Sequence, residues 1–366
     1  MKHDQGGAAP GPVARNRANG RLRASAMILL AATVAAAQPA RALVIKPIFD
    51  SSITSQSDAA QIESAFNSAA AVFDRAFANP ATVNIAVSWG SVAGGAIPAG
   101  DISTSMDNLS GAYSYAGVVS YLTAASKANP LNTVLATAVS HLPKTDPTRL
   151  GQFEIPYAEA KALGMLPAAL PMMDGYIGFD SKVAYDFNPA GGITAGDYDF
   201  QGLAAHEIEE VLGRITGLQS SGVDWATPFD LYRYAAAGVS SFSYGAHAYF
   251  SVNGGQTDLG NFNYSGGGDR SDWLTLSAST DVQDAYVYTG KALTLSATDL
   301  QALDALGWGV SRLTGSTPLS TIGALSPTGG ALSAVPEPAT WAMMLVGAAL
   351  IGGRARRRRW GAISAQ

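Results

Sequence analysis

The spacing of apolar residues predicts that strands and helices alternate between residues 43 and 310. Residues 81–90 alternate Val, Ile, Val and Trp with polar or small residues, a period of two that is typical of a half-buried strand. Residues 57–80 repeat Ile, Phe and Ala at helical spacing, and Ser57 or Asp58 can cap the start of that helix. A helix followed by a strand indicates an α+β domain.

The rest of this region continues the same alternation. Residues 174–188 are rich in aromatic and β-branched residues, and predict a strand pair or a strand and loop. Tyr176 and Phe179 in it either line a peptide-binding sheet edge or belong to the core. The other predicted elements are a strand and turn (43–53), helices (113–128, 156–164, 201–216), short strands after residue 228 (the last within 284–290), and a closing helix (295–309) with a capping box of Ser296 and Asp299.

The first 42 residues predict a secretory signal peptide. Polar residues that include four arginines precede the apolar run 26–37, and Ala40 and Ala42 form an A-x-A cleavage site. A permanent membrane anchor is disfavoured because a span needs roughly 20 apolar residues. We therefore expect signal peptidase to cleave after Ala42.

The last residues predict a second sorting signal. Residues 335–360 begin with Pro-Glu-Pro, continue with a short apolar stretch and end in an arginine cluster. This order resembles the PEP-CTERM signal of exported Gram-negative bacterial proteins, which an exosortase cuts near the P-E-P. The resemblance implies transient insertion of the tail in the inner membrane and a final place in the periplasm, on the outer surface or outside the cell. Residues 311–334, rich in Ser, Thr, Gly and Pro, predict a linker.

Without the two signals, the charge balance becomes strongly acidic. The whole chain has 23 basic and 28 acidic residues, but the body keeps 12 basic and 26 acidic, a net charge of −14. Such a body should repel nucleic acid and is compatible with cation binding. Because the chain has no cysteine, a zinc ion would need His, Asp or Glu ligands.

The sequence AAHEIEEVLGR at 204–214 carries the strongest chemical signal. His206 and Glu210 lie one turn apart on one helix face, and Glu207 lies at its edge, while the apolar residues face the other way. Two ligands can thus approach one metal ion while Glu207 reaches its water. Alternatively, the glutamates form a solvated face on which Arg214 pairs with Glu210.

This helix, the D-L-Y-R-Y sequence at 230–234 and the D-x-x-A-L-D-x-L-G-W sequence at 299–308 resemble exported bacterial zincin-type, metzincin-like metalloproteases that carry PEP-CTERM tails. The resemblance implies a zincin-like domain over 43–310: a twisted mixed sheet packed on helices, including the active-site helix, with a small C-terminal subdomain. It makes His206 a zinc ligand and Glu207 the general base. Glu210 replaces the second histidine of H-E-x-x-H.

The third ligand is open, since Thr216, which occupies the metzincin position, is a poor zinc ligand. Asp230 is the first candidate, His247 the second and Asp224 the third. Asp230 could equally form a turn, and His247 could simply pack against aromatic neighbours.

A further cation site is considered in the sequence GGGDRSDW. Asp269 and Asp272 lie there in a glycine-rich turn and could hold calcium through oxygen ligands, or could form Asx turns.

The sequence therefore predicts a secreted or surface-sorted zinc endopeptidase that hydrolyses peptide bonds of a peptide or protein substrate. The alternative is a catalytically inactive protein that keeps the zincin fold and binds a surface or exopolysaccharide matrix.

Overall fold

The computed structural model describes residues 43–309, except for 220–224, 267 and 277–278. These residues belong to one compact unit that combines helices with several sheets, which confirms the α+β class. None of the described helices is long and apolar enough to cross a membrane.

Three of the predicted segments lie outside the described residues. They are the signal peptide (1–42), the linker (311–334) and the sorting tail with its transient membrane insertion (335–360).

The main sheet has four strands in the order β1-β2-β8-β5. β1 (Val44–Phe49), β2 (Thr82–Trp89) and β8 (Gly175–Phe179) are parallel, whereas β5 (Ser103–Asp107) runs antiparallel to β8. The sheet is therefore mixed, and β5 is one of its two edges.

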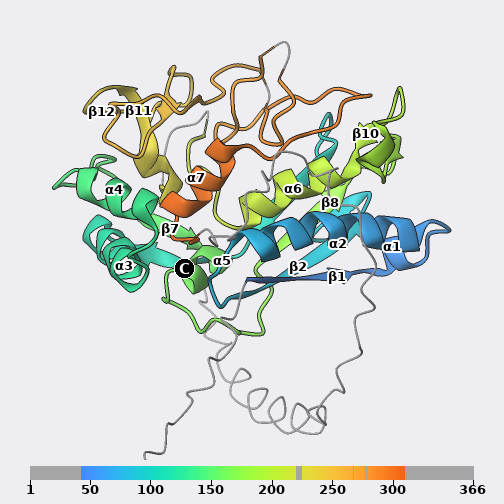
Figure 1. Cartoon of the computed structure of the whole chain (residues 1–366), viewed down its shortest axis with the longest axis horizontal. Coiled ribbons are helices and arrows are strands. Elements are labelled where there is room, and N and C mark those ends of the chain that lie inside the picture. Colours follow the sequence, from blue (N-terminus) through green and yellow to red (C-terminus); the bar gives the residue numbers. More distant parts are fainter. Residues whose placement is uncertain (1–42, 220–224, 267, 277–278, 310–366) are drawn as a thin grey trace, which may run out of the picture. The chain divides into compact units, whose positions relative to one another are not determined.

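Two helices, α2 (Ala59–Ala76) and α6 (Phe200–Val211), pack against each other and cover one face of this sheet (Figure 1). Alternation along β2 explains the layering, because Val83, Ile85 and Val87 are fully buried while Thr82, Asn84 and Ala86 are only partly buried. The core thus lies between the sheet and these helices, and it holds α6 in place.

Shorter elements surround this core. They are α1 (Ser51–Thr54), the paired β3 (Ser91–Val92) and β4 (Gly95–Ala96), the paired β6 (Leu109–Tyr113) and β7 (Phe153–Pro156), α3 (Tyr115–Ala128), α4 (Thr133–His141), α5 (Tyr157–Ala162), the paired β9 (Tyr185–Asp186) and β10 (Tyr198–Asp199), and the 3-10 helices Pro189–Gly191 and Phe229–Tyr232.

The C-terminal part forms a second four-stranded sheet and a last helix. The sheet has the order β12 (Val239–Ser240), β11 (Arg233–Ala236), β13 (Tyr249–Phe250) and β14 (Gly260–Asn261). In α7 (Ala297–Ala305) the capping box of Ser296 and Asp299 is present as predicted. These elements occupy the place of the predicted subdomain, but they belong to the same compact unit as the main sheet.

Some predicted boundaries are wrong. α6 ends at Val211 instead of 216, because Gly213 adopts φ +121°, a conformation that glycine tolerates and that stops the helix. Helix α4, which ends at His141, was not among the predicted helices. Residues 284–290 form no strand.

The aromatic strand is internal. β8 lies between β2 and β5, and its Phe179 is fully buried, so the core interpretation of that residue holds. The strand at the edge beside β8 is β5, whose sequence Ser-Thr-Ser-Met-Asp has no apolar alternation from which a strand could be predicted.

Candidate metal site

Helix α6, which carries the two candidate ligands in sequence, is fixed at both ends. At its start the Asp199 carboxylate accepts hydrogen bonds from the main-chain N–H groups of Gly202 (3.1 Å) and Leu293 (2.9 Å). At its end the carbonyl of Leu212 accepts a hydrogen bond from the Trp308 indole (2.7 Å). The L-G-W sequence after α7 therefore holds the C-terminal end of this helix.

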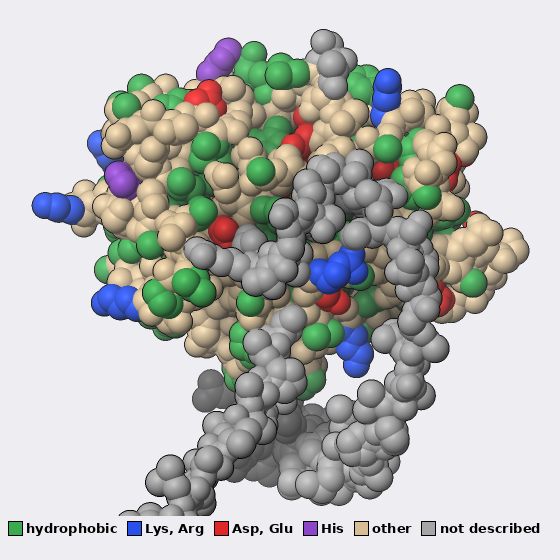
Figure 2. Space-filling view, viewed as in Figure 1, with side chains coloured by type: hydrophobic (Ala, Val, Ile, Leu, Met, Phe, Trp, Pro, Cys, Tyr) green, Lys and Arg blue, Asp and Glu red, His purple; other side chains and the backbone are tan. Residues whose placement is uncertain are grey.

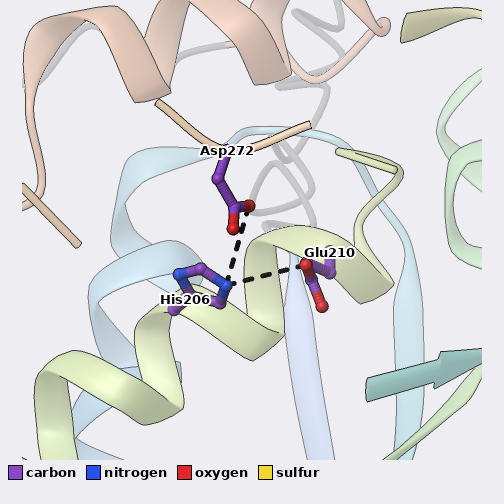
Figure 3. Close-up of side chains that lie close together, drawn as sticks. All are labelled: His206, Glu210 and Asp272. Atoms are coloured by element: carbon purple, nitrogen blue, oxygen red, sulfur yellow. Dashed lines mark ion pairs between the residues drawn. The ribbon is translucent and has the colours of Figure 1, made fainter. Parts of the chain in front are cut away.

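Three side chains converge above α6 (Figure 3). His206 Nε2 lies 3.6 Å from Glu210 Oε1 and 3.9 Å from Asp272 Oδ1. Among the described residues these three form the one group of at least three His, Asp or Glu side chains whose ligand atoms all lie within 4.8 Å of one another. Two come from one helix face, as predicted, and the third comes from a loop 66 residues further along the chain.

The spacing and the unmet polar atoms suit a metal ion. Ligand atoms about 2.0–2.2 Å from a tetrahedral zinc lie about 3.3–3.6 Å apart, slightly less than the distances found here. Asp272 is 4% exposed, and its Oδ1 has no hydrogen-bond partner among the described residues. A carboxylate oxygen that is buried away from water and has no hydrogen-bond partner destabilises the folded state. A cation between these side chains would satisfy it.

One segment orients both His206 and Asp272. The His206 Nδ1 lies 2.7 Å from the carbonyl of Val282, so Nδ1–H donates to that oxygen and Nε2 faces the carboxylates. Gln283 donates from Nε2 to the His206 carbonyl (3.0 Å), and its own carbonyl accepts a hydrogen bond from the main-chain N–H of Trp273, the residue after Asp272 (2.8 Å). Residues 282–283 therefore contact both His206 and the neighbour of Asp272.

Strand β5 supplies hydroxyl groups to the two glutamates. Ser105 Oγ donates to Glu210 Oε2 (2.7 Å), and Ser103 forms a side-chain hydrogen bond with Glu207. Burial and the Glu210 carboxylate raise the pKa of Glu207 well above its usual range. Burial alone would raise the pKa of Glu210 too, but its hydrogen bonds with His206, Ser105 and Glu207 lower it overall.

The electrostatic field at His206 favours positive charge. Burial opposes protonation of the imidazole, but the carboxylates of Asp272, Glu210 and Glu207 outweigh it and raise the pKa of His206 well above its ordinary value. The same field acts on Asp269, whose pKa rises to about 7, chiefly because of the Glu210 carboxylate. A bound cation would relieve this repulsion.

Glu207 is buried beside the three-residue group, close to Glu210 and His206. It is 2% exposed, and its Oε2 has no hydrogen-bond partner among the described residues. The solvated-face interpretation of α6 is wrong, because Glu209 (0%) and Glu210 (5%) are buried as well. Arg214 is also fully buried and lies 4.0 Å from Glu209, instead of pairing with Glu210 at the surface.

Asp230, the first choice for third ligand, is not brought to this group. Its carboxylate accepts hydrogen bonds from the main-chain N–H groups of Gly217 and Thr227 (both 2.9 Å) and from the Thr216 hydroxyl. Its oxygens thus stabilise the loop after α6, as in the alternative interpretation in which Asp230 forms a turn. Thr216 lies beyond the helix and likewise supplies no ligand atom to the group.

Neither of the other two predicted candidates, His247 and Asp224, supplies the third ligand in the described residues. His247 is exposed and stacks on Tyr264, with ring centroids 3.7 Å apart. Asp224 lies outside the described residues. We therefore correct the third candidate ligand to Asp272, which the sequence analysis had considered only for calcium. Its neighbour Asp269 is exposed and stays outside the three-residue group.

Basic side chains are sparse on the visible surface. Figure 2 shows Lys and Arg side chains lying singly and apart from one another, on a face formed mostly by uncharged polar groups and backbone.

Comparison with known proteins bears on the tail of the chain. Residues 334–359 match the PEP-CTERM protein-sorting motif, which confirms the predicted sorting segment to within a residue. No curated protein and no solved structure matches the chain. The protein is thus an exported one that is sorted via the membrane and recognised by an exosortase.

Proposed function

We propose that this protein is an exported metal-dependent peptidase of zincin-like architecture, in which His206, Glu210 and Asp272 hold one zinc ion. The observation that carries the proposal is the convergence of one imidazole and two carboxylates within 4.8 Å, beside a third buried carboxyl group, Glu207, with an unpartnered oxygen. One nitrogen and two oxygen ligands suit zinc and leave a fourth position for water.

A zinc ion held by these residues would supply Lewis acidity, which polarises a carbonyl and makes a water more acidic. Glu207 takes the proton of the attacking water and later delivers it to the leaving amine. Its pKa is raised by burial and by Glu210, and a nearby cation lowers it again toward the range in which it is ionised and can act as a base.

Strand β5 offers a place for the substrate backbone. It is one of the two edge strands of the main sheet, and its Ser103 and Ser105 contact Glu207 and Glu210. Extended peptides bind by adding a strand to an exposed edge. A peptide paired with β5 would therefore pass directly beside the candidate metal site.

The test uses the purified full chain. We expect elemental analysis to find about one zinc per chain, and a quenched-fluorescence peptide library to report hydrolysis that a chelator abolishes. Glu207→Gln should keep the zinc and lower kcat by about 10²–10⁴-fold, the usual contribution of a general base.

Glu63→Gln on α2, a glutamate outside the site, is the matched control and should behave as wild type. Full hydrolysis by Glu207→Gln would reject the assigned base. Stoichiometric zinc without any hydrolysis would instead support the metal-binding, non-catalytic alternative.

A further inference from the structure

A polar hollow of about 200 Å³ adjoins the candidate metal site at Glu210. Its walls are the second half of β5, the residues that follow α6 (215–218), Tyr244 and the turn 269–271. Pockets for drug-sized ligands measure about 300–1,000 Å³. This hollow therefore has the size for one side chain of a bound peptide.

Acidic residues outnumber basic ones in its lining. Asp107, Glu210 and Asp269 contribute carboxylates. The lining also includes Arg270, but its guanidinium is already engaged: it donates to four main-chain carbonyls and stacks on the Tyr244 ring at 4.0 Å. Three carboxyl groups against one guanidinium leave an excess of acidic groups in the lining, and the printed contacts of Arg270 are with carbonyls and not with these carboxyl groups.

One of these carboxyl groups has an oxygen without a partner, and another also belongs to the candidate metal site. Asp107 lies on the same face of β5 as Ser105, the face that meets α6, and its Oδ1 is buried without a hydrogen-bond partner among the described residues. Glu210 is 5% exposed and directs one oxygen to Ser105 and the other toward His206.

A second metal ion fits the hollow poorly. The carboxylates of Asp107, Glu210 and Asp269 do not meet within 4.8 Å, since the one described group that does is His206, Glu210 and Asp272. A metal ion needs ligands that converge on a point, whereas a guanidinium or ammonium group on a long side chain can reach acceptors that are further apart.

We propose that this hollow binds the positively charged side chain of an arginine or lysine next to the scissile bond. The inference rests on the proposed peptidase function, because it says which substrates the peptidase would prefer: those with a basic residue beside the scissile bond. The pocket itself can be tested without hydrolysis.

The binding test uses propylguanidine, which copies the end of an arginine, and its neutral isostere propylurea. Calorimetry is run on the zinc-supplemented full chain, on Asp269→Asn and on Asp58→Asn. Asp269 is exposed, so its substitution spares the fold, and Asp58 at the start of α2 is a matched control outside the hollow. Zinc content is measured for each variant.

We expect saturable binding of propylguanidine, at least tenfold weaker binding of propylurea, and a Kd raised at least tenfold by Asp269→Asn but unchanged by Asp58→Asn. Equal binding of both probes, or an unchanged Kd in Asp269→Asn, would overturn the proposal.

The hydrolysis test compares peptides that differ only by arginine or citrulline beside the scissile bond. We expect kcat/KM to be at least tenfold higher for arginine, and Asp269→Asn to abolish that preference. Hydrolysis without this preference overturns the basic pocket and leaves the peptidase proposal standing. Selective guanidinium binding without hydrolysis of any peptide rejects the peptidase proposal and keeps the pocket.

Discussion

Replacing Asp272 with asparagine should change stability in opposite directions with and without zinc. In metal-free protein the carboxylate is 4% exposed, lies close to Glu210, and has one oxygen without a partner. Burial is the largest cause that raises its pKa from 3.8 to about 6, and the Glu210 charge adds to it. Keeping this group ionised above pH 6 therefore destabilises the folded state.

The size of the effect follows from that pKa. At about 1.4 kcal/mol per pH unit, ionised Asp272 costs the folded, metal-free protein up to about 3 kcal/mol. Because the folded pKa exceeds the unfolded one, this cost grows as the pH rises from about 4 to about 6 and stays constant above. With chelator at pH 8, Asp272→Asn should thus be more stable than wild type by about 1–3 kcal/mol.

Zinc reverses the order. A ligand present at 100 times its Kd stabilises the folded state by about 2.7 kcal/mol. Wild type should gain at least that much in saturating zinc, while Asp272→Asn, with one ligand weakened, gains much less. The assay is urea unfolding of the full chain at pH 8, with chelator and with zinc.

Asp230→Asn is the control for this experiment. Asp230 accepts hydrogen bonds from Gly217 and Thr227, so the substitution should lower stability equally with and without zinc. The reasoning is refuted if zinc stabilises Asp272→Asn as much as wild type, or if Asp230→Asn is the variant that loses the zinc response.

Three further changes probe the structure around the site, each by urea unfolding. Lys161→Met leaves the buried Asp174 carboxylate without its 2.6 Å ion pair and should lower the free energy of unfolding by about 3–5 kcal/mol. Adding Asp174→Asn should restore part of that stability. A loss below about 1 kcal/mol in Lys161→Met would contradict the prediction. Gly213→Ala should cost about 1–3 kcal/mol, because φ is +121° and the new Cβ would lie 2.9 Å from a carboxylate oxygen of Glu159; unchanged stability would refute the strain. Burial raises the pKa of Asp74 to about 6, so the stability lost between pH 4 and pH 7 should be smaller in Asp74→Asn than in wild type by about 1–2 kcal/mol, a figure discounted for partial exposure. Equal losses in the two proteins would argue against it.

Local periodicity was enough to predict part of the site. His206 and Glu210 share a helix face because four residues make about one turn, and this holds whatever packs above the helix. The capping box of Ser296 and Asp299 was likewise readable, since both of its hydrogen bonds lie within four residues. Such features are determined by residues within a few positions in the sequence, so they can be predicted without knowledge of distant contacts.

Asp272 could not be predicted as a ligand, because its position depends on contacts distant in sequence. It lies in a loop without any period, and its neighbour Trp273 is held by hydrogen bonds with Gln283 and Ala285. The spacing of 66 residues from His206 carries no signal. Asp230 looked better because it follows the helix sooner, but the loop it closes uses both of its oxygens.

Burial of the glutamates was also invisible in the sequence. Three glutamates in four positions are typical of a solvated helix face, yet Glu207, Glu209 and Glu210 are at most 5% exposed. They are buried because β5 packs on one side of the helix and the C-terminal segments pack on the other.

The reliance of His206 and Asp272 on residues 282–283 has a consequence for an exported chain. The helix can form early from local interactions, but until the last third of the domain has folded onto it, the imidazole has no fixed orientation and the third ligand is elsewhere. An unfinished or truncated polypeptide therefore lacks the metal geometry altogether. The three candidate ligands can therefore converge only once residues 282–283 have packed against α6.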